Sequence, residues 1–439
     1  MGNIYNSLKN VFQILKKENN SNIAFGLILI VLFTIPLSYA LNSVATGMLL
    51  LITIFTFQKK NFTFQLNLIY PILLYVLMLL SFFWSIDQKT TLTAILKEIP
   101  LLIIPLAFML FKDFSKDQKQ KIIQFYSYGI LLFTVFYYLK AIIRFILSHN
   151  TEVFFYHELV TKDVNAIHVS VYVSMAFFHF FIKIKKEIID YIAMTLLFAM
   201  VFLLASKNII IVFIGLLLIY YLFLTKISRR MRMRNLILFL LFLFSLSFVG
   251  KIRDRFMVEI QTNTKVSLSA DVDLNKQTGI NNISIVEAWT KEYFAPSDYF
   301  PGTAFRVYQF RMFLELFHEE PVFWTGYGLN ASKEKLLEKE KKYNLHEGYG
   351  TYNFHNQYIQ NFAELGVFGF VLLMIMLVLN VRNAFKSKDF IHFAFAILMI
   401  SLFLTESFLW RQRGVVFFTI MYCLFNSKSV DLMHKTENK

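Results

Sequence analysis

The sequence predicts an all-α polytopic membrane protein with about twelve transmembrane helices and a largely helical long loop between spans nine and ten. Of the 439 residues, 56% are hydrophobic and only 17% are charged, and the mean hydropathy is +0.53. Soluble proteins carry roughly 25% charged residues, and a single water-soluble core cannot bury so large an apolar fraction. At roughly 20 residues per spanning helix, the apolar residues suffice for about twelve spans. This composition excludes a soluble enzyme, a disordered protein and a disulfide-stapled secreted domain.

Twelve apolar segments mark the expected spans, with Phe, Leu and Ile prominent throughout. In chain order they are Ile23–Ser38, Ala40–Phe57, Leu66–Phe83, Ala94–Phe111, Ile122–Ile146, His168–Ile182, Ile188–Ala205, Ile209–Leu224, Leu236–Val249, Val367–Val381, Phe390–Leu404 and Val415–Phe425.

The distribution of Lys and Arg assigns the two sides of the membrane. If the N-terminus is cytoplasmic, the seven inside segments hold 23 Lys and Arg, whereas the outer connections other than the long loop hold only Lys89, Lys97, Lys162, Lys207, Arg411 and Arg413. The net charge of +15 therefore follows mainly from the positive-inside pattern, and it favours anionic lipid rather than nucleic acid as the partner. We expect a multi-pass membrane protein with both termini in the cytoplasm.

The long loop divides the chain into three parts. Residues 1–249 form an N-terminal bundle of nine spans, residues 250–366 form the loop on the outer, periplasmic side, and residues 367–439 supply the last three spans and a cytoplasmic tail. The loop holds 13 Lys and Arg against 15 Asp and Glu, so its charge is nearly balanced. Because it contains helical patterns, we expect a small structured domain rather than a linker.

An apolar helix pattern covers residues 304–317 of the long loop, with Thr303 as the expected N-cap. On this helix Arg311 and Glu315 have the i,i+4 spacing of a solvated ion pair. Arg306 lies instead on the apolar stripe, in the first turn, together with Phe310, Phe313 and Phe317.

Arg306 has two interpretations. A helix N-terminus attracts anions, and an arginine adds a fork that matches phosphate oxygens, so an anion-binding role follows from its position. The alternative is an arginine that snorkels or pairs with a carboxylate.

Further along the loop, Gly326 and Gly328 indicate a tight backbone turn, for which an ordinary interhelical turn is the simplest interpretation. The Lys- and Glu-rich segment 333–342 is typical of a solvated helix face.

A His-Asn pair opens the next helical pattern, in which His355, Tyr358, Ile359 and Phe362 share one face that ends at the membrane entry. A histidine at this position can transfer a proton near neutral pH. The alternative is an interfacial histidine that only makes hydrogen bonds.

Two charged residues at the outer ends of spans need an explanation. Lys207 follows Ser206 at the tip of a membrane hairpin, where it either snorkels or lines a phosphate site. Glu406 opens the last outer turn, close to Arg411 and Arg413, and local pairing is its simplest interpretation.

No sequence motif predicts a metal or a cofactor. The chain has no HExxH, no paired CxxC, no Walker A motif and no GxGxxG, and it has no G-x-S-x-G nucleophile elbow. ATP hydrolysis and serine-hydrolase chemistry are therefore poorly supported.

Taken in order, these pieces resemble the O-antigen ligase and O-antigen polymerase superfamily of bacterial inner-membrane, GT-C-like glycosyltransferases. The specific motif covers about 70 residues around the long loop, whereas the layout matches over most of the chain. The motif consists of Arg306, Pro321 with Gly326 and Gly328, His355-Asn356, and then Gly366 and Gly369. The segments Leu80–Asp87 and Thr405–Gly414 also resemble outer turns of the family.

The resemblance implies a metal-independent enzyme that moves a glycan from undecaprenyl diphosphate to a sugar hydroxyl of lipid A-core at the periplasmic face. It implies that Arg306 holds the diphosphate and that His355 acts at the acceptor hydroxyl. Lys207 stands where the family has an arginine, so it keeps the charge without the bidentate fork. Asn356, Tyr358, Gly326 and Gly328 are the further substrate-binding candidates.

Several alternatives remain open at this point, among them protein O-glycosylation and a membrane-bound sensor or scaffold. A polymerase of the same superfamily uses a growing glycan as acceptor, and the sequence does not distinguish this acceptor from lipid A-core. A polytopic transporter or flippase also has about twelve spans, but it favours two similar halves and ionisable residues near the midplane. Neither feature is evident here, since the charged residues gather at one outer loop.

Overall fold

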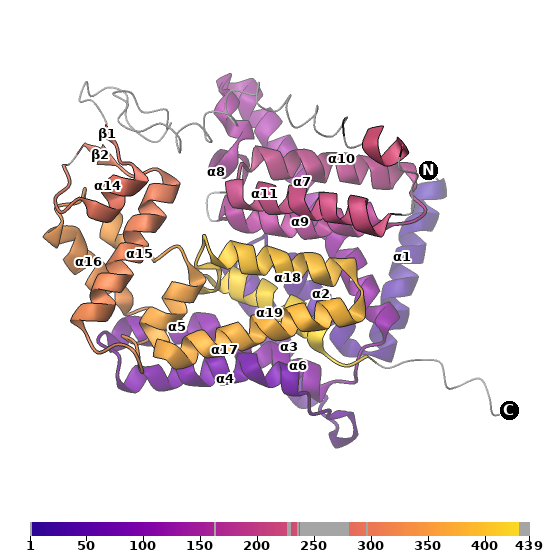
Figure 1. Cartoon of the computed structure of the whole chain (residues 1–439). Helices are drawn as coiled ribbons and strands as arrows, with labels where there is room; N and C mark the ends of the chain where they lie inside the picture. The colour runs from indigo at the N-terminus through magenta and orange to yellow at the C-terminus, as the bar shows by residue number, and fades with distance from the viewer. Residues whose placement is uncertain are drawn as a thin grey trace.

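The computed structural model describes residues 2–161, 164–225, 230–234, 237, 281–295 and 297–429. Nearly all of the ninth expected span, Leu236–Val249, and the first part of the long loop lie outside the described residues. Figure 1 shows the remainder as a bundle of helices with the described part of the long loop at one end and α1 at the other.

The N-terminal part of the chain is helical almost throughout. Its helices are α1 Gly2–Ser21, α2 Ile23–Thr34, α3 Tyr39–Phe55, η1 Lys59–Asn61, α4 Leu66–Leu80, η2 Ser81–Phe83, α5 Gln88–Glu98, α6 Pro100–Leu110, α7 Lys116–Ser148, η3 Thr151–Phe154, α8 Tyr156–Leu159, α9 Ala166–Ile182, α10 Ile188–Leu203, α11 Lys207–Ile219 and the π-helical turn η4 Tyr220–Leu224.

The rest of the chain contains the long loop and the last helices of the bundle. In order these are β1 Asn281–Asn282, α14 Ile285–Thr290, β2 Asp298–Tyr299, α15 Gly302–Glu319, α16 Ser332–Lys342, η5 Tyr349–Thr351, α17 Gln357–Ser387, α18 Phe390–Phe403, η6 Phe408–Trp410 and α19 Gln412–Asn426. The two short strands pair in parallel, with Asn281 opposite Asp298.

The expected all-α membrane architecture is confirmed, because the described residues form mainly apolar helices. Within the described residues, five helical segments are long and apolar enough to cross a membrane, and five shorter apolar helices accompany them. Helices occupy eleven of the twelve expected segments, and the third corresponds to the segment Leu66–Phe83. The total of twelve spans stays a prediction, because the ninth segment is not described.

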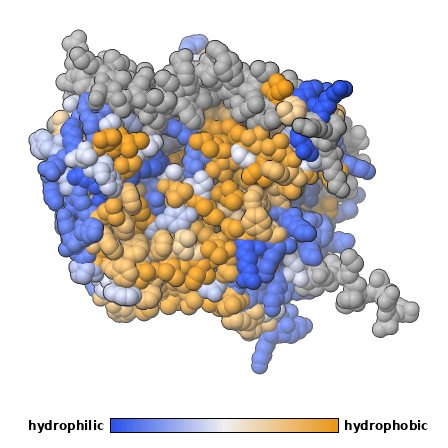
Figure 2. Space-filling model, viewed as in Figure 1, coloured by the Kyte–Doolittle hydropathy of each residue, from blue (hydrophilic) through white to orange (hydrophobic). Residues whose placement is uncertain are grey.

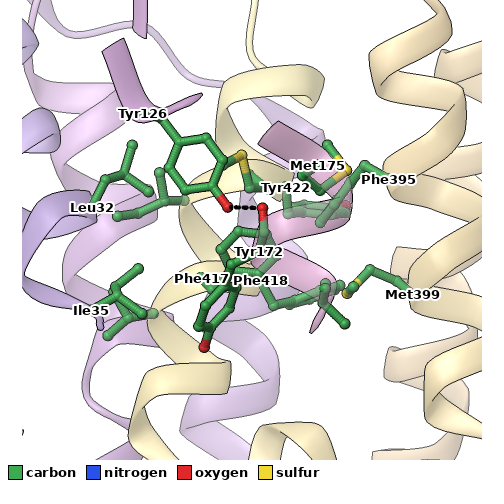
Figure 3. Packing of buried hydrophobic residues seen from close by; sticks show 14 of the residues in the cluster. Leu32, Ile35, Tyr126, Tyr172, Met175, Phe395, Met399, Phe417, Phe418 and Tyr422 are labelled. Carbon is green, nitrogen blue, oxygen red and sulfur yellow. Dashed lines mark hydrogen bonds between the residues drawn. The ribbon is translucent and has the colours of Figure 1, made fainter. Parts of the chain in front are cut away.

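The bundle is held together by one large apolar cluster that joins helices distant in sequence. Figure 3 shows its centre, where Tyr126 of α7 donates a hydrogen bond of 3.0 Å to the carbonyl of Tyr172 in α9. The ring of Tyr172 packs against Phe417 of α19 with centroids 4.7 Å apart. Aromatic rings bury much apolar area with few rotatable bonds, so the Phe-rich composition supplies the packing between these helices.

Polar contacts define two opposite ends of the bundle. At the end that we call the basic end, Asn22 donates to the carbonyl of Lys112, Lys119 donates to the carbonyl of Ser427, and Asn67 donates to the carbonyl of Asn426. These contacts join segments that the Lys and Arg distribution assigns to the cytoplasmic side of the membrane.

We call the opposite end the loop end, because the long loop packs there. Trp84 donates to the carbonyl of Thr325, and Thr91 donates to the carbonyl of Leu329. The turn after α4 therefore anchors the loop to the bundle.

The described part of the long loop has a hydrophobic cluster of its own, which includes Phe294, Phe300, Tyr308, Met312 and Phe354. In Figure 2 the surface over α14 and α16 is mostly hydrophilic, whereas the bundle exposes a broad hydrophobic surface. A lipid-facing bundle that carries a water-facing loop accounts for this division.

The charged helix of the loop differs from the expected solvated face. Lys339 of α16 is only 4% exposed, and its ammonium group contacts Glu315 and Glu319 of α15 at 2.9 Å. The expected Arg311–Glu315 pair is present at 2.9 Å, but its side chains are 12% and 22% exposed, so it is not a solvated pair. A buried charge must be paired, and these charges therefore join α15 to α16.

Candidate active site

Arg306 projects from α15 toward a turn of the bundle. Its Nε donates to the carbonyl of Thr405 at 2.8 Å, and its Nη1 donates to the carbonyl of Gly302 at 2.8 Å. No described carboxylate forms an ion pair with Arg306, so the carboxylate-paired alternative is not found in this part of the chain. Its Nη2 has no hydrogen-bond partner among the described residues and remains available to an anion.

The start and the buried face of α15 differ from the expectation. The helix begins at Gly302 after Pro301, so Thr303 lies inside the helix and is not its N-cap. Arg306 consequently occupies the second turn. The most buried face of α15 carries Phe305, Tyr308 and Met312, because this face covers the loop's own hydrophobic cluster.

His355 precedes α17 and is not part of the helix face on which it was expected. Asn356 is the N-cap, and its Oδ1 accepts from the backbone N–H groups of Tyr358 and Ile359. His355 lies just before this cap, outside the helix, and has a left-handed φ of 48°. Non-glycine residues rarely adopt this conformation, which often occurs at functional sites. The His355 backbone N–H donates to Asn353 Oδ1 at 2.9 Å.

The side chain of His355 contacts a buried carboxylate. Its Nδ1 lies 3.4 Å from Oε2 of Glu406, a residue that is 3% exposed. The His355 side chain keeps 23% of its surface exposed, so one face of the ring remains reachable from solvent. The rings of Phe305 and Tyr352 flank it at centroid distances of 5.7 and 5.8 Å.

Glu406 is ionised at neutral pH in this arrangement. Burial raises the pKa of its carboxyl, but the hydrogen bond and charge of His355 and the charges of His168 and Arg306 outweigh burial and lower the pKa to about 2. A carboxylate held in this state orients the imidazole and stabilises its protonated form. The contact found for the Glu406 carboxylate is with His355, 51 residues earlier in the chain, and the expected local pairing with Arg411 or Arg413 stays a prediction.

Thr405 and Leu404, in the same turn, collect contacts from three other elements. The Thr405 hydroxyl accepts from Asn208 at 2.7 Å, and the Thr405 carbonyl accepts from Arg306. The carbonyl of Leu404 accepts from Asn356 at 3.2 Å. The turn 404–406 therefore joins the start of α11, the start of α15 and the start of α17 in one place.

Lys207 is the first residue of α11 and directly precedes Asn208. Asn208 also bonds to Ser401 of α18, since its Nδ2 donates to the Ser401 carbonyl and its Oδ1 accepts from the Ser401 hydroxyl, both at 2.7 Å. These bonds fix the first turn of α11 beside the turn 404–406. Lys207 thus lies on the same end of the bundle as Arg306 and His355.

The remaining candidates have contacts that hold backbone segments together. At Gly326 a Cβ would lie 2.4 Å from the carbonyl carbon of Glu364, and at Gly328 it would lie 2.4 Å from the side chain of Ser85. Both glycines also have positive φ, so they allow the loop to approach α17 and the turn after α4. The Tyr358 hydroxyl donates to the carbonyl of Ile400 at 3.0 Å and joins α17 to α18.

Glu406 is the functional candidate that the sequence analysis did not select. The segment Thr405–Gly414 was noted as similar to a family turn, and Glu406 is the only carboxylate in it. This was the available signal. Within the described residues, no group of three or more His, Cys, Asp or Glu has the arrangement of a metal site.

The arrangement combines a proton acceptor and a cation within one polar turn. His355 with its Glu406 partner has the composition of a general base. Arg306 presents to an anion a guanidinium N–H that bonds to none of the described residues. The fold and the site together define a helical membrane protein with a histidine–carboxylate pair and an arginine at one end of the bundle.

Comparison with known families agrees with this class. The family model described as O-antigen ligase matches residues 192–374, a region that contains Lys207, Arg306 and His355. The matched region, which is less than half of the chain, is therefore similar to the O-antigen ligase family. No curated protein matches the chain.

Proposed function

We propose that the protein transfers a glycan from undecaprenyl diphosphate to a sugar hydroxyl of lipid A-core at the periplasmic face of the inner membrane. The observation that carries this proposal is the convergence of Arg306 and His355 on the consecutive residues Thr405 and Glu406. A glycan transferase needs a cation beside its leaving group and a base beside its acceptor, and these two residues supply both. The family match supports the reaction class.

The chemistry follows from the two ring nitrogens of His355. A proton on Nδ1 directed at Glu406 leaves the lone pair on Nε2 free to accept the proton of the acceptor hydroxyl. The acceptor oxygen then attacks the anomeric carbon, and the bond between that carbon and the phosphate oxygen breaks. The electron pair of the broken bond leaves with the lipid diphosphate.

The developing charge on the diphosphate requires fixed cations in a site of low dielectric. Arg306 provides an N–H group that no described residue occupies, and Lys207 provides a second cation from the start of α11. Asn356 holds the turn 404–406 against α17 and so keeps His355 and Glu406 together. Broad hydrophobic surfaces of the bundle suit the undecaprenyl chain of the donor.

The decisive experiment is glycan transfer by purified variants in detergent, with the undecaprenyl-diphosphate-linked glycan as donor and lipid A-core as acceptor. His355→Ala and Arg306→Ala should abolish transfer while membrane insertion stays intact. The side chain of exposed His346 contacts the carbonyl of the adjacent Glu347, so His346→Ala is the matched control and should retain transfer. Near-normal transfer by His355→Ala or Arg306→Ala would defeat the proposal.

A second pair of variants tests the guanidinium fork. Arg306→Lys keeps the charge but loses the fork, and it should lower transfer by about 10-fold or more, in the range of one lost charge-assisted contact. Arg311→Lys on the same helix is the control, because Arg311 pairs with Glu315 rather than facing the turn 404–406. If Arg306→Lys and Arg311→Lys lowered glycan transfer equally, the proposal that Arg306 holds the diphosphate would be wrong.

The acceptor is decided by the glycans of a strain that lacks the protein. Long glycans stranded on the lipid carrier together with bare core indicate the proposed ligase. Core that bears a single repeat indicates a polymerase instead. If the glycans of this strain are unchanged, the protein does not act in lipopolysaccharide assembly.

A further inference from the structure

The contact between His355 and Glu406 joins two segments that lie outside regular helix. His355 directly precedes the N-cap of α17, and Glu406 lies in the turn between α18 and η6. A base and the group that orients it act together only when both are held within about 0.5 Å of the productive geometry. Some other group must therefore hold these two segments in register.

One side chain of α17, Gln360, contacts the neighbours of both residues. Its Oε1 accepts from the backbone N–H of Phe354 at 3.1 Å and from the hydroxyl of Ser407 at 3.4 Å. Phe354 directly precedes His355, and Ser407 directly follows Glu406. Because a carbonyl oxygen has two lone pairs, this single atom can hold the two segments together.

The other end of the Gln360 amide is held by buried groups as well. Its Nε2 donates to Oε1 of Glu364 and to the hydroxyl of Ser332, the latter at 3.3 Å. Gln360, Glu364 and Ser332 are all buried. Since the Phe354 backbone N–H can only donate, the amide oxygen faces Phe354 and the amide nitrogen faces Glu364. The amide is therefore fixed in one orientation.

Side chains of α17 hold the turn on both sides of Glu406. Asn356 donates to the carbonyl of Leu404, two residues before Glu406, at 3.2 Å. Gln360 contacts Ser407 on the other side. Gln360 differs from Asn356 because it also contacts the residue that precedes His355, so loss of its amide would release both segments at once.

A second buried amide of the same helix makes contacts of a different kind. Asn361 is as buried as Gln360. Its Oδ1 accepts from Gln357, and its Nδ2 donates to the carbonyl of Gly369. These partners both belong to α17, so Asn361 serves as a matched control for the loss of a buried amide.

We propose that Gln360 is a positioning residue, which sets the distance and orientation between His355 and Glu406 through Phe354 and Ser407. This inference rests on the proposed glycan transfer, in which His355 is the base. Gln360 itself touches no reacting atom, and it acts only through the pair that it holds.

The test measures initial rates of transfer by purified, folded Gln360→Met and Asn361→Leu, each alone and combined with Glu406→Ala. Methionine keeps the length of glutamine without its amide. Gln360→Met should lower kcat by about 10- to 100-fold, because misplacing a catalytic group by about 1 Å can cost that much, with little change in KM for donor or acceptor. In the Glu406→Ala background it should have little further effect, since the pair that it positions is already lost. Asn361→Leu should retain kcat.

Two further measurements keep the proposal testable if Gln360→Met folds poorly or if rates are low. Ser407→Ala removes one of the two contacts at Gln360 Oε1 and should lower kcat by about 3-fold, again only when Glu406 is present. A structure of Gln360→Met, or of Ser407→Ala in its place, should show the distance from His355 Nδ1 to Glu406 Oε2 lengthened from 3.4 Å to about 4 Å or more, where no hydrogen bond remains.

A purely structural role predicts different results. An equal fold-loss of kcat with and without the Glu406 side chain, an equal loss in Asn361→Leu, or an unchanged distance from Nδ1 to Oε2 would overturn the proposal. A raised KM with unchanged kcat would also overturn it, because that result describes a residue of substrate binding. Absence of transfer by the unaltered protein would defeat the proposed function instead, and the distance in the variant would still decide whether Gln360 positions the pair.

Discussion

The two ends of the bundle use polar side chains for different purposes. At the basic end, Asp113 accepts from Thr63 and Gln65, both at 2.9 Å, and Glu18 accepts from Lys121 at 2.7 Å. These contacts are made between protein groups and tie the ends of helices together. At the loop end, the Glu406 carboxylate contacts His355 Nδ1 at 3.4 Å, and Arg306 retains an N–H group with no partner among the described residues.

This difference separates structure from function. Buried polar groups are normally satisfied, so a network that saturates its own groups serves stability. Groups that are oriented but left with spare donors or acceptors are instead suited to a substrate. The comparison therefore supports the proposal that the chemistry lies at the loop end.

The largest expected effect comes from neutralising one carboxylate at each end. Glu406→Gln keeps the size of the side chain but removes the charge that stabilises protonated His355, so transfer should fall by about 100-fold or more. Asp113→Asn keeps an oxygen that accepts from Thr63 and Gln65 and should retain transfer. Initial rates of the purified variants measure the contrast, and similar rates for the two would mean that the ends do not differ in function.

Salt bridges in the long loop and at the basic end differ in burial. Lys339 is 5% exposed at its side chain and contacts two carboxylates, so Lys339→Ala should destabilise the protein by about 3–5 kcal/mol. Lys121 is 26% exposed, and Lys121→Ala should cost about 1 kcal/mol or less. Thermal unfolding in detergent compares the two variants. A larger loss for the Lys121 variant would contradict the burial argument.

Backbone packing gives a third contrast, of intermediate size. Gly366 has a φ of 63°, and a Cβ there would lie 2.2 Å from the carbonyl oxygen of Trp324, so Gly366→Ala should destabilise by about 1–3 kcal/mol. Apart from the nearby backbone of α3 itself, no atom of the described residues lies within 4 Å of a Cβ at Gly47. Gly47→Ala should therefore be neutral or stabilising by up to about 1 kcal/mol. If Gly366→Ala and Gly47→Ala lowered the unfolding temperature equally, the close contact between Gly366 and Trp324 would not matter for stability.

The last contrast is a pH dependence at the loop end. The pKa of Glu406 is lowered from 4.5 to about 2 in the folded protein, so its contribution to stability is present above pH 4.5 and is lost as the pH falls toward 2. The stability difference between the unaltered protein and Glu406→Gln should therefore shrink over this range. A difference that stays constant with pH would contradict the ionised state of Glu406.

Hydropathy and charge were sufficient to place most helices. The expected span Leu66–Phe83 matches its helical segment, and Ile188–Ala205 and Ile209–Leu224 correspond to α10 and to α11 with η4. These positions follow from local composition, because an apolar run of this length must be helical to satisfy its backbone in lipid. The interruption near Ser206 is a helix end, with Ala205 at a positive φ.

Local pattern was less reliable inside the long loop. The helical wheel placed Arg306 and Phe310 on the main apolar face, but α15 buries the face of Phe305 and Tyr308, because the surrounding loop packs there. The same limitation led to a solvated interpretation of Lys339. Periodicity identifies a helix, whereas its buried side depends on which other elements pack against it.

The sequence by itself determined the helical membrane architecture, the grouping of basic segments and the candidates Arg306 and His355, since each depends on residues close together in the chain. Only the tertiary structure decided that these two residues meet at one turn and that Glu406 is the partner of His355. Their contacts join positions 99 and 51 residues apart. The physical reason is that a charge is stabilised by whatever lies within a few ångströms of it, and that neighbourhood is created by packing rather than by sequence order.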